Sequence, residues 1–292
     1  MSRFILNQSI TDVTLWLVMA PILDGRALAA RIREKIKTRV AVLPSKPGLA
    51  VILVGNDPAS HLYVSLKQQA CEEAGISFEL NLYPSDTSQK DLIAKIEELN
   101  RRDDINGILV QLPLPSQNAD QIIASIDPLK DVDGFHPENL KRLREGKPAI
   151  ASAVALGVMK LIDEANARGT ACIVSSPLFA APLQILLQER GVDSTVVQAE
   201  NPELVHHVRE ADILIVAEGI PGLITGTMVK PGATVIDVGT TRTDEGLKGD
   251  IDFESVEKIA GAITPVPGGV GPMTVAMLLV NILKAYDLQR KA

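Results

Sequence analysis

The chain has 292 residues, of which 46% are apolar and 22% charged, and 29 basic against 36 acidic residues give a net charge of −7. This length and composition leave room for about two globular domains and exclude a disordered or low-complexity protein. The acidic balance argues against nucleic acid or an anionic membrane as a partner. Cys71 and Cys172 form no C-x-x-C pair or Cys/His cluster, so the sequence predicts neither a disulfide framework nor a metal site and fits the cytoplasm.

Residues 1–19 are interpreted as an N-terminal extension. The apolar stretch 15–23 is far shorter than the ~20 residues that a membrane-spanning helix needs. It also lacks the basic start and the small-residue cleavage site of a secretory signal. We therefore predict no membrane segment here.

Short β-branched runs alternate with helical patterns from residue 49 onward, as in βαβ units around a mainly parallel sheet. In the first half we expect strands over 49–55, 78–84 and 105–115, and helices from an Asp57-Pro58 turn to about residue 74 and over 88–102. The polar, turn-rich segment 127–148 is interpreted as the link between two lobes, with a boundary near residue 150.

The second half repeats this alternation in a rhythm that resembles a nucleotide-binding doubly wound sheet. The expected strands are 171–176, 194–199, 212–219, 233–239 and 262–269, with helices over 177–191, 202–211 and 271–288. The last helix could return to the first lobe. We therefore predict a two-lobed α/β fold, in which residues 20–150 plus 270–292 form the catalytic lobe and residues 151–269 a Rossmann-like lobe.

The helix expected after Asp57-Pro58 places chemically useful side chains on one face. Tyr63 and Lys67 are spaced i, i+4, and Ser60 lies one turn before Tyr63. An aromatic ring beside an amine could stack a planar heterocycle and hold the amine at its reacting carbon. Crowding would lower the pKa of the amine and make it a proton-transfer group. The same pair is also compatible with ordinary surface side chains.

Polar residues near two strand ends could complete a site with this helix. Gln111 lies in the expected strand 105–115, at the carboxyl end where ligands of open parallel sheets bind, and its amide could orient Lys67. Asp131 and Asp133 stand in a loop that could return over the same edge. A carboxylate there could accept paired N–H donors from an aminopyrimidine ring. Taken alone, each of these residues could equally be a turn or cap residue.

Five longer segments carry a family resemblance. They are YVSLKQQACEEAGI, GILVQLPLP, KDVDGFHPEN, VIDVG and ITPVPGGVGPMTVAMLL. Together they resemble the bifunctional methylenetetrahydrofolate dehydrogenase/methenyltetrahydrofolate cyclohydrolase family, often called FolD, from about Ile22 to the C-terminus.

The resemblance implies a role for each matching residue. Lys67 is then catalytic and Gln111 holds it, while Tyr63 stacks on the pterin and Asp133 anchors it. The glycines of the loop Pro265 to Thr274 let backbone approach the folate. The residues predicted to bind substrate are Ser60, Tyr63, Asp133, Pro267, Gly268, Gly269 and Gly271.

The phosphate-binding turn departs from the family pattern, which reads roughly G-x-S-x-x-V-G-x-P. Here the stretch is VSSPLFAAP, so Val174 and Ala180 replace the two glycines and Ala181 replaces a basic residue. We expect Val174 and Ala180 to crowd the pyrophosphate, which normally sits at the helix N-terminus. The residues that remain as predicted cofactor-binding positions are Ser176, Pro182, Gly219 and Gly239.

Partners for the 2′-phosphate of NADP are missing as well. The stretch Gln198 to Asn201 stands where the family has an H-S-x-T-like sequence. Glu200 would repel that phosphate but could accept a hydrogen bond from the ribose of NAD. NADP, NAD and the absence of a nucleotide therefore all remain open.

These features predict an enzyme of one-carbon folate metabolism with its site between the lobes. We favour hydrolysis of 5,10-methenyltetrahydrofolate to 10-formyltetrahydrofolate, because the cationic bridge carbon needs only water and proton transfer by Lys67. NAD(P)-dependent oxidation of 5,10-methylenetetrahydrofolate depends on the altered turn. The alternatives are a fully bifunctional enzyme, a non-catalytic folate-binding relative and an unrelated Rossmann oxidoreductase. The resemblance also implies a homodimer that binds small folates.

Overall fold

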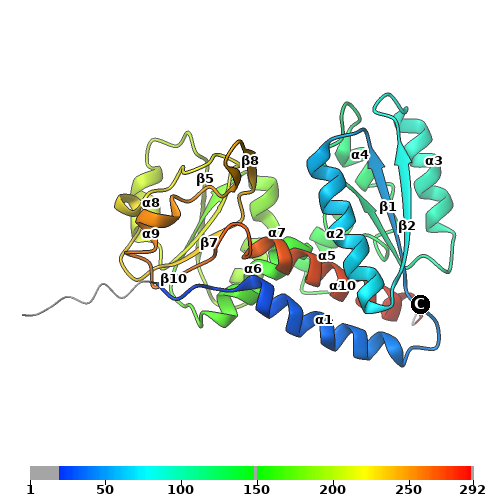
Figure 1. Cartoon of the computed structure of the whole chain (residues 1–292), viewed down its shortest axis with the longest axis horizontal. Helices are drawn as coiled ribbons and strands as arrows, with labels where there is room; N and C mark the ends of the chain where they lie inside the picture. Colours follow the sequence, from blue (N-terminus) through cyan, green and yellow to red (C-terminus); the bar gives the residue numbers. More distant parts are fainter. Residues whose placement is uncertain (1–19, 148–149, 291–292) are drawn as a thin grey trace, which may run out of the picture.

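The computed structural model describes residues 20–147 and 150–290, so the predicted extension 1–19 lies outside the described residues. Two parallel sheets form the cores of two lobes, joined by long helices that begin between the lobes and run along the first lobe (Figure 1). None of the helices within the described ranges is long and apolar enough to cross a bilayer. The predicted two-lobed α/β architecture is confirmed.

The first sheet has the order β2-β1-β3 and is entirely parallel. Its strands are β2 (Ser77–Tyr83), β1 (Gly48–Val54) and β3 (Gly107–Val110). Alternate residues of buried β1 face opposite sides, so α2 (Pro58–Ala74) packs on one face and α3 (Gln89–Asn100) with α4 (Ala119–Ile123) on the other. Strand β3 is shorter than expected and ends before the QLPLP segment, whose prolines have no N–H for a sheet.

The second sheet has the order β10-β7-β6-β4-β5. Its strands are β4 (Ala171–Ser175), β5 (Ser194–Val197), β6 (Ile213–Ala217), β7 (Thr234–Asp237) and β10 (Ala262–Ile263). Its helices are α6 (Ala153–Glu164), α7 (Pro177–Gln188), α8 (Leu204–Glu210) and α9 (Phe253–Val256), with a 3-10 turn, η1 (Gly226–Met228). The expected strand 262–269 is only two residues long, because the remainder forms the Gly/Pro loop. The hairpin of β8 (Thr241–Thr243) and β9 (Gly246–Lys248) was not expected.

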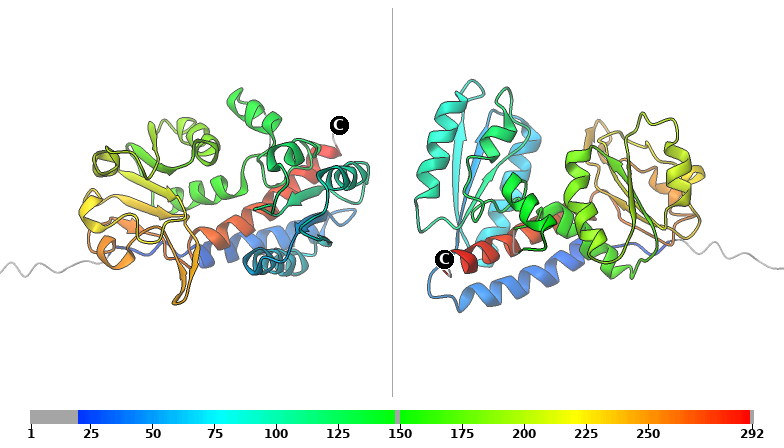
Figure 2. Two further views of the ribbon diagram at one scale, coloured as in Figure 1. Left: turned by 90° about the horizontal axis from the view of Figure 1, so that it is seen from above. Right: turned by 180° about the vertical axis from the view of Figure 1, so that it is seen from behind.

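Helices α1 (Gly25–Ala41) and α10 (Val270–Gln289) lie side by side and connect the lobes (Figure 2). Helix α10 contacts α2 and β3 as well as α6, so the C-terminal helix does return to the first lobe. Residues 20–23 pair with β10, where Leu23 N donates to Ile263 O at 2.8 Å. The domain boundaries stay a prediction, and this contact favours counting residues 20–23 with the second sheet.

The described part of the predicted link, residues 127–147, is more than a plain connection, because it contains the helix α5 (Pro137–Arg144). Buried Asp131 organises the turn before α5 by accepting hydrogen bonds from Gly134 N and His136 N. Buried Asn281 of α10 donates through Nδ2 to Val132 O and Ala151 O, both at 2.8 Å. The loop that carries Asp133 is therefore held from two sides.

Candidate functional site

The structure brings Lys67 and Gln111 together at the carboxyl edge of the first sheet. Lys67 Nζ donates to Gln111 Oε1 at 2.8 Å. Gln111 Nε2 donates to Leu112 O at 2.7 Å, and its backbone N–H donates to Ile52 O at 2.9 Å. Because the amide nitrogen is engaged by a carbonyl, the amide oxygen has to face the lysine. The predicted pairing of these two residues is present in the fold.

The electrostatic surroundings of Lys67 favour a proton-transfer group. Burial lowers its pKa below the ordinary value of 10.5, and the nearby Asp133 carboxylate opposes that shift. Asp133 keeps some solvent exposure, yet the protein atoms around it desolvate the carboxylate and raise its pKa, with Lys67 acting in the opposite sense. The two groups therefore form an amine–carboxylate pair close enough to influence each other.

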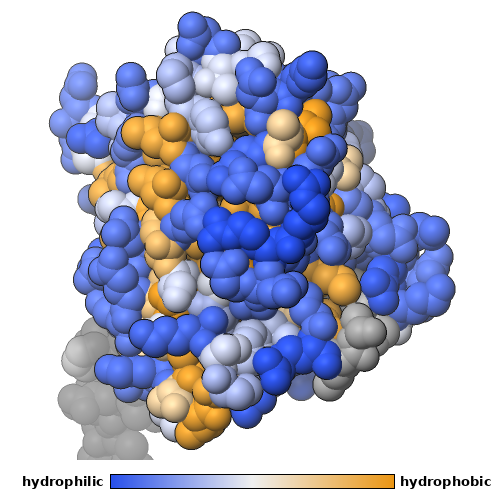
Figure 3. Space-filling view, turned by 90° about the vertical axis from the view of Figure 1, so that its right-hand side faces the viewer, coloured by the Kyte–Doolittle hydropathy of each residue, from blue (hydrophilic) through white to orange (hydrophobic). Residues whose placement is uncertain are grey.

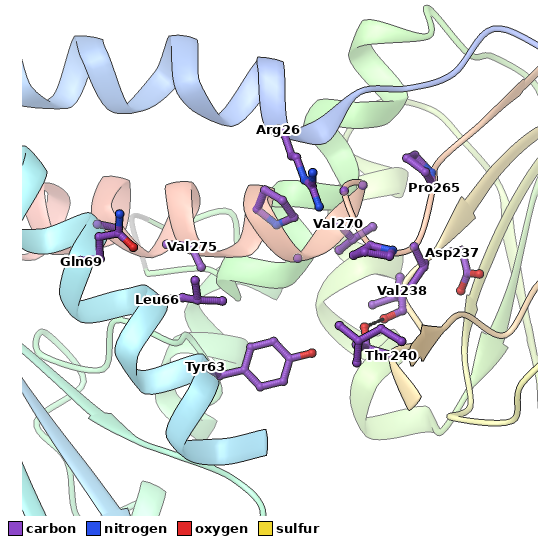
Figure 4. Close-up of a pocket in the computed structure, with 18 of the residues that line it drawn as sticks. Arg26, Tyr63, Leu66, Gln69, Asp237, Val238, Thr240, Pro265, Val270 and Val275 are labelled. Carbon is purple, nitrogen blue, oxygen red and sulfur yellow. Dashed lines mark hydrogen bonds between the residues drawn. The ribbon is translucent and has the colours of Figure 1, made fainter. Parts of the chain in front are cut away.

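A cavity of about 390 Å³ lies between the lobes; we call it the cleft cavity, and its lining does not include Lys67, Gln111 or Asp133. Tyr63, one turn before Lys67 on α2, points its ring into it, and Val238 and Thr240 face it from the second lobe (Figure 4). The Gly/Pro loop contributes Pro267, Gly268 and Gly269 to the lining, and the first turn of α10 contributes Gly271. The cleft cavity is thus walled by both lobes and brings together most of the predicted folate-binding residues.

Arg26, which sequence reasoning missed, also reaches the cleft cavity from the first turn of α1 (Figure 4). Its backbone N–H donates to Gly268 O at 3.0 Å, and Gly25 packs so tightly on the loop that a Cβ there would lie 1.9 Å from Gly269 O. No motif marked this arginine, because its place depends on the packing of α1 against a loop more than 200 residues later in the chain.

Ser60 does not line the cleft cavity. It is only 4% exposed, and its Oγ donates to Asp57 Oδ2 at 2.8 Å while its N–H donates to the same oxygen. Asp57 is the N-cap of α2, so Ser60 completes the cap. The folate-binding role of Ser60 stays a prediction that this geometry does not support.

The altered phosphate turn does not act in the way that we expected. Val174 lies in β4 and Ala180 in α7, both fully buried, and they pack into the cores on opposite faces of the sheet. The expectation that these side chains crowd a phosphate was therefore wrong. The turn itself presents Pro177, which has no N–H, and Leu178, which is 60% exposed. Ser176 is the N-cap of α7 and accepts from Phe179 N at 3.4 Å.

The other predicted cofactor-binding residues have structural contacts. Gly219 N donates to Asp250 Oδ2 at 2.9 Å, and a Cβ on Gly239 would lie 2.2 Å from Asp250 Cγ. Both glycines therefore pack around a buried carboxylate. Pro182 is buried within α7. Their cofactor-binding role stays a prediction.

A second cavity, of about 640 Å³, opens where β5 ends; we call it the β5 cavity. Pro177 borders it on one side, and Gln198, Glu200 and Asn201 border it on the other. Within the described ranges, none of the residues lining it is basic. The lining therefore does not fit the 2′-phosphate of NADP.

Fold and site together define a two-lobed α/β enzyme with a cavity between the lobes and a lysine–amide pair at the carboxyl edge of the first sheet. The family model described as tetrahydrofolate dehydrogenase/cyclohydrolase, catalytic domain, matches residues 23–133, and that described as the NAD(P)-binding domain of the same family matches residues 152–290. The chain belongs to the tetrahydrofolate dehydrogenase/cyclohydrolase family and is an enzyme of one-carbon folate metabolism.

Individual relatives agree with this assignment. The bifunctional protein FolD of Bordetella avium is 49% identical over 277 residues, which cover 92% of this chain and 98% of the relative. The crystal structure of FolD from Campylobacter jejuni is 42% identical with a TM-score of 0.88, covering 92% of this chain and 99% of that chain. FolD of Trypanosoma brucei, solved with NADP and an inhibitor, is 35% identical with a TM-score of 0.88, covering 94% and 99%.

Proposed function

We propose that this chain hydrolyses 5,10-methenyltetrahydrofolate to 10-formyltetrahydrofolate. The observation that carries the proposal is the 2.8 Å contact from Lys67 Nζ to Gln111 Oε1, one helical turn along α2 from Tyr63, which lines the cleft cavity. Water adds to the cationic bridge carbon while Lys67 accepts a proton from it. The bond from that carbon to N5 then breaks as the formyl carbonyl forms; N5 receives the proton back from Lys67, and the remaining hydroxyl proton is released to solvent. Gln111 orients the amine throughout.

The substrate-binding roles follow from the same geometry. The Asp133 carboxylate, held near Lys67, accepts hydrogen bonds from the aminopyrimidine part of the pterin. The Tyr63 ring supplies an apolar face for stacking. The loop with Gly268 and Gly269 lets backbone approach the remainder of the folate.

Oxidation of 5,10-methylenetetrahydrofolate also needs a nicotinamide nucleotide, which would bind to the second lobe. The names of the bifunctional relatives and the NADP-bound Trypanosoma brucei structure support that activity in the family. We propose that this chain binds NADP weakly and prefers NAD, because Glu200 borders the β5 cavity in place of a basic partner. No step of the hydrolysis depends on the nucleotide.

The decisive experiment measures both reactions on the purified protein. A decrease in methenyltetrahydrofolate absorbance without added nucleotide reports hydrolysis. An increase in the same absorbance, starting from methylenetetrahydrofolate with NADP or NAD, reports oxidation. We expect hydrolysis without nucleotide and little oxidation with NADP. Folate binding without hydrolysis would favour the non-catalytic alternative. Micromolar NADP binding with rapid oxidation would establish the fully bifunctional one.

The stacking role of Tyr63 predicts different effects for two substitutions. Tyr63→Phe keeps the ring and should change folate affinity little. Tyr63→Ala should weaken binding by roughly 1–3 kcal/mol, as loss of a large aromatic contact commonly does. Isothermal titration with a folate analogue measures both. Equal affinity in the two variants would place the pterin elsewhere.

We also propose that the chain forms a homodimer through β2. This strand is the edge of its sheet and displays Leu80 and Leu82, which are 42% and 53% exposed. Apolar side chains emerge between hydrophilic ones on the face of the first lobe shown in Figure 3. An open apolar edge is suited to pairing with a second copy. Leu82→Lys should shift the protein toward monomer in light scattering, and an unchanged mass would exclude this interface.

A further inference from the structure

Three segments of the chain leave the second sheet side by side at its carboxyl edge. Strand β4 lies between β5 and β6, with Val174 opposite Val197 and Ser175 opposite Ala217. The residues that follow β5 and β6 therefore lie at about the same height along the strand direction as the turn that leads from β4 into α7. This is the point where the chain order reverses and where open α/β sheets bind nucleotides.

The Glu218 side chain spans this point. It follows the last residue of β6, and its Oε1 accepts a hydrogen bond from Ala199 N, just past β5, at 3.1 Å. Strands β5 and β6 are two strand spacings apart, roughly 10 Å. A side chain that connects their ends has to pass over the end of β4, above the turn at Ser176.

The backbone around Glu218 is anchored. Glu218 N donates to Asp250 Oδ2 at 2.7 Å, and Asp250 is fully buried. In the described part of the chain no basic side chain forms an ion pair with Glu218. Burial raises the pKa of Glu218, and the nearby Glu200 and Asp250 carboxylates act in the same direction, whereas the bond from Ala199 N opposes them.

We propose that Glu218 is a specificity-determining residue that obstructs the dinucleotide site, because its carboxylate lies over the β4–α7 turn where the pyrophosphate would bind. The inference rests on the weak nucleotide binding proposed above and assigns it to one residue. A carboxylate at that position repels a pyrophosphate and takes up its space. The buried side chains of Val174 and Ala180 neither repel a pyrophosphate nor take up its space.

Calorimetric titration with NAD and NADP tests the proposal on the full chain and on three variants. Glu218→Ala removes both charge and volume, and should raise NAD affinity roughly tenfold or more. Glu218→Gln removes only the charge, because its amide oxygen can still accept from Ala199 N, and should give a smaller gain. The control Glu189→Ala removes an exposed charge at the far end of α7 and should change nothing.

In Glu218→Ala the affinity for NADP should increase less than the affinity for NAD, since Glu200 still borders the β5 cavity. Adding the substitution Glu200→Gln should then raise the affinity for NADP in particular. Hydrolysis of methenyltetrahydrofolate, which does not use this edge, reports whether each variant is folded. If Glu218→Ala no longer hydrolyses methenyltetrahydrofolate, that variant is taken as misfolded, and the titration of Glu218→Gln alone tests the proposal.

The proposal is overturned if the folded Glu218 variants bind NAD within about twofold of the unmodified chain, a change well under 1 kcal/mol by the tenfold-per-1.4 kcal/mol relation. It is also overturned if the unmodified chain already binds NADP at micromolar concentration. Failure of the proposed function would appear separately, as missing hydrolysis in the unmodified protein.

Discussion

Lys67→Met is expected to lower the rate of methenyltetrahydrofolate hydrolysis by about two to four orders of magnitude, the usual contribution of a positioned proton-transfer group. Methionine keeps most of the aliphatic volume of the side chain but cannot accept a proton. Folding and folate affinity should therefore persist while kcat falls. Stopped-flow or steady-state absorbance measures the rate, and titration with a folate analogue measures the affinity.

A double-mutant cycle is the control for this assignment. Gln111→Ala removes the acceptor 2.8 Å from Lys67 Nζ and should slow hydrolysis by releasing the amine from its position. If Gln111 acts through Lys67, the two losses are not additive, and Lys67→Met with Gln111→Ala is about as slow as Lys67→Met alone. Full turnover in Lys67→Met would show that another group transfers the proton.

Asp133→Asn should raise KM for folate by about ten- to a hundredfold, because a charged acceptor contributes roughly 1.5–3 kcal/mol to a hydrogen bond. The same change should move the pH profile of kcat. Burial lowers the pKa of Lys67 below 10.5, and the Asp133 carboxylate now limits that shift. Without it the amine loses its proton more readily, so the rising limb of kcat moves to lower pH.

The pH experiment separates two roles of Asp133. A residue that only binds the pterin changes KM and leaves the pH at which kcat rises where it was. A residue that also sets the charge state of Lys67 moves the rising limb. Asp133→Glu restores the charge and should return the limb toward its original pH. A limb displaced to higher pH would contradict the proposed amine–carboxylate pair.

Much of the fold was accessible from local pattern. The β-branched runs and the turn signals located four of the five strands of the second sheet within two residues at each end. Helix α1 was missed, although Leu28, Ile32, Ile36 and Val40 recur every four residues on one of its faces. The signal was present, but it lay before residue 49, where the strand–helix alternation begins.

The candidate site divides in the same way. Tyr63 and Lys67 share a helix and Gln111 directly follows a strand, so their positions predicted a pairing of Lys67 with Gln111 that the fold contains. Asp131 and Asp133 looked equivalent in the sequence. Only the packed loop separates them, because Asp131 accepts backbone N–H groups of its own turn while Asp133 stays beside Lys67.

The sequence by itself determined the family, the two-lobed architecture and the chemical identity of the pair Lys67 and Gln111. Tertiary structure decided where side chains in the phosphate turn point. Val174 and Ala180 face the two cores, whereas Glu218, which no motif marked, reaches across the end of β4. The reason is physical: spacing along one element can be read from residue order, but the direction of a side chain at a sheet edge depends on strands brought together from distant parts of the chain.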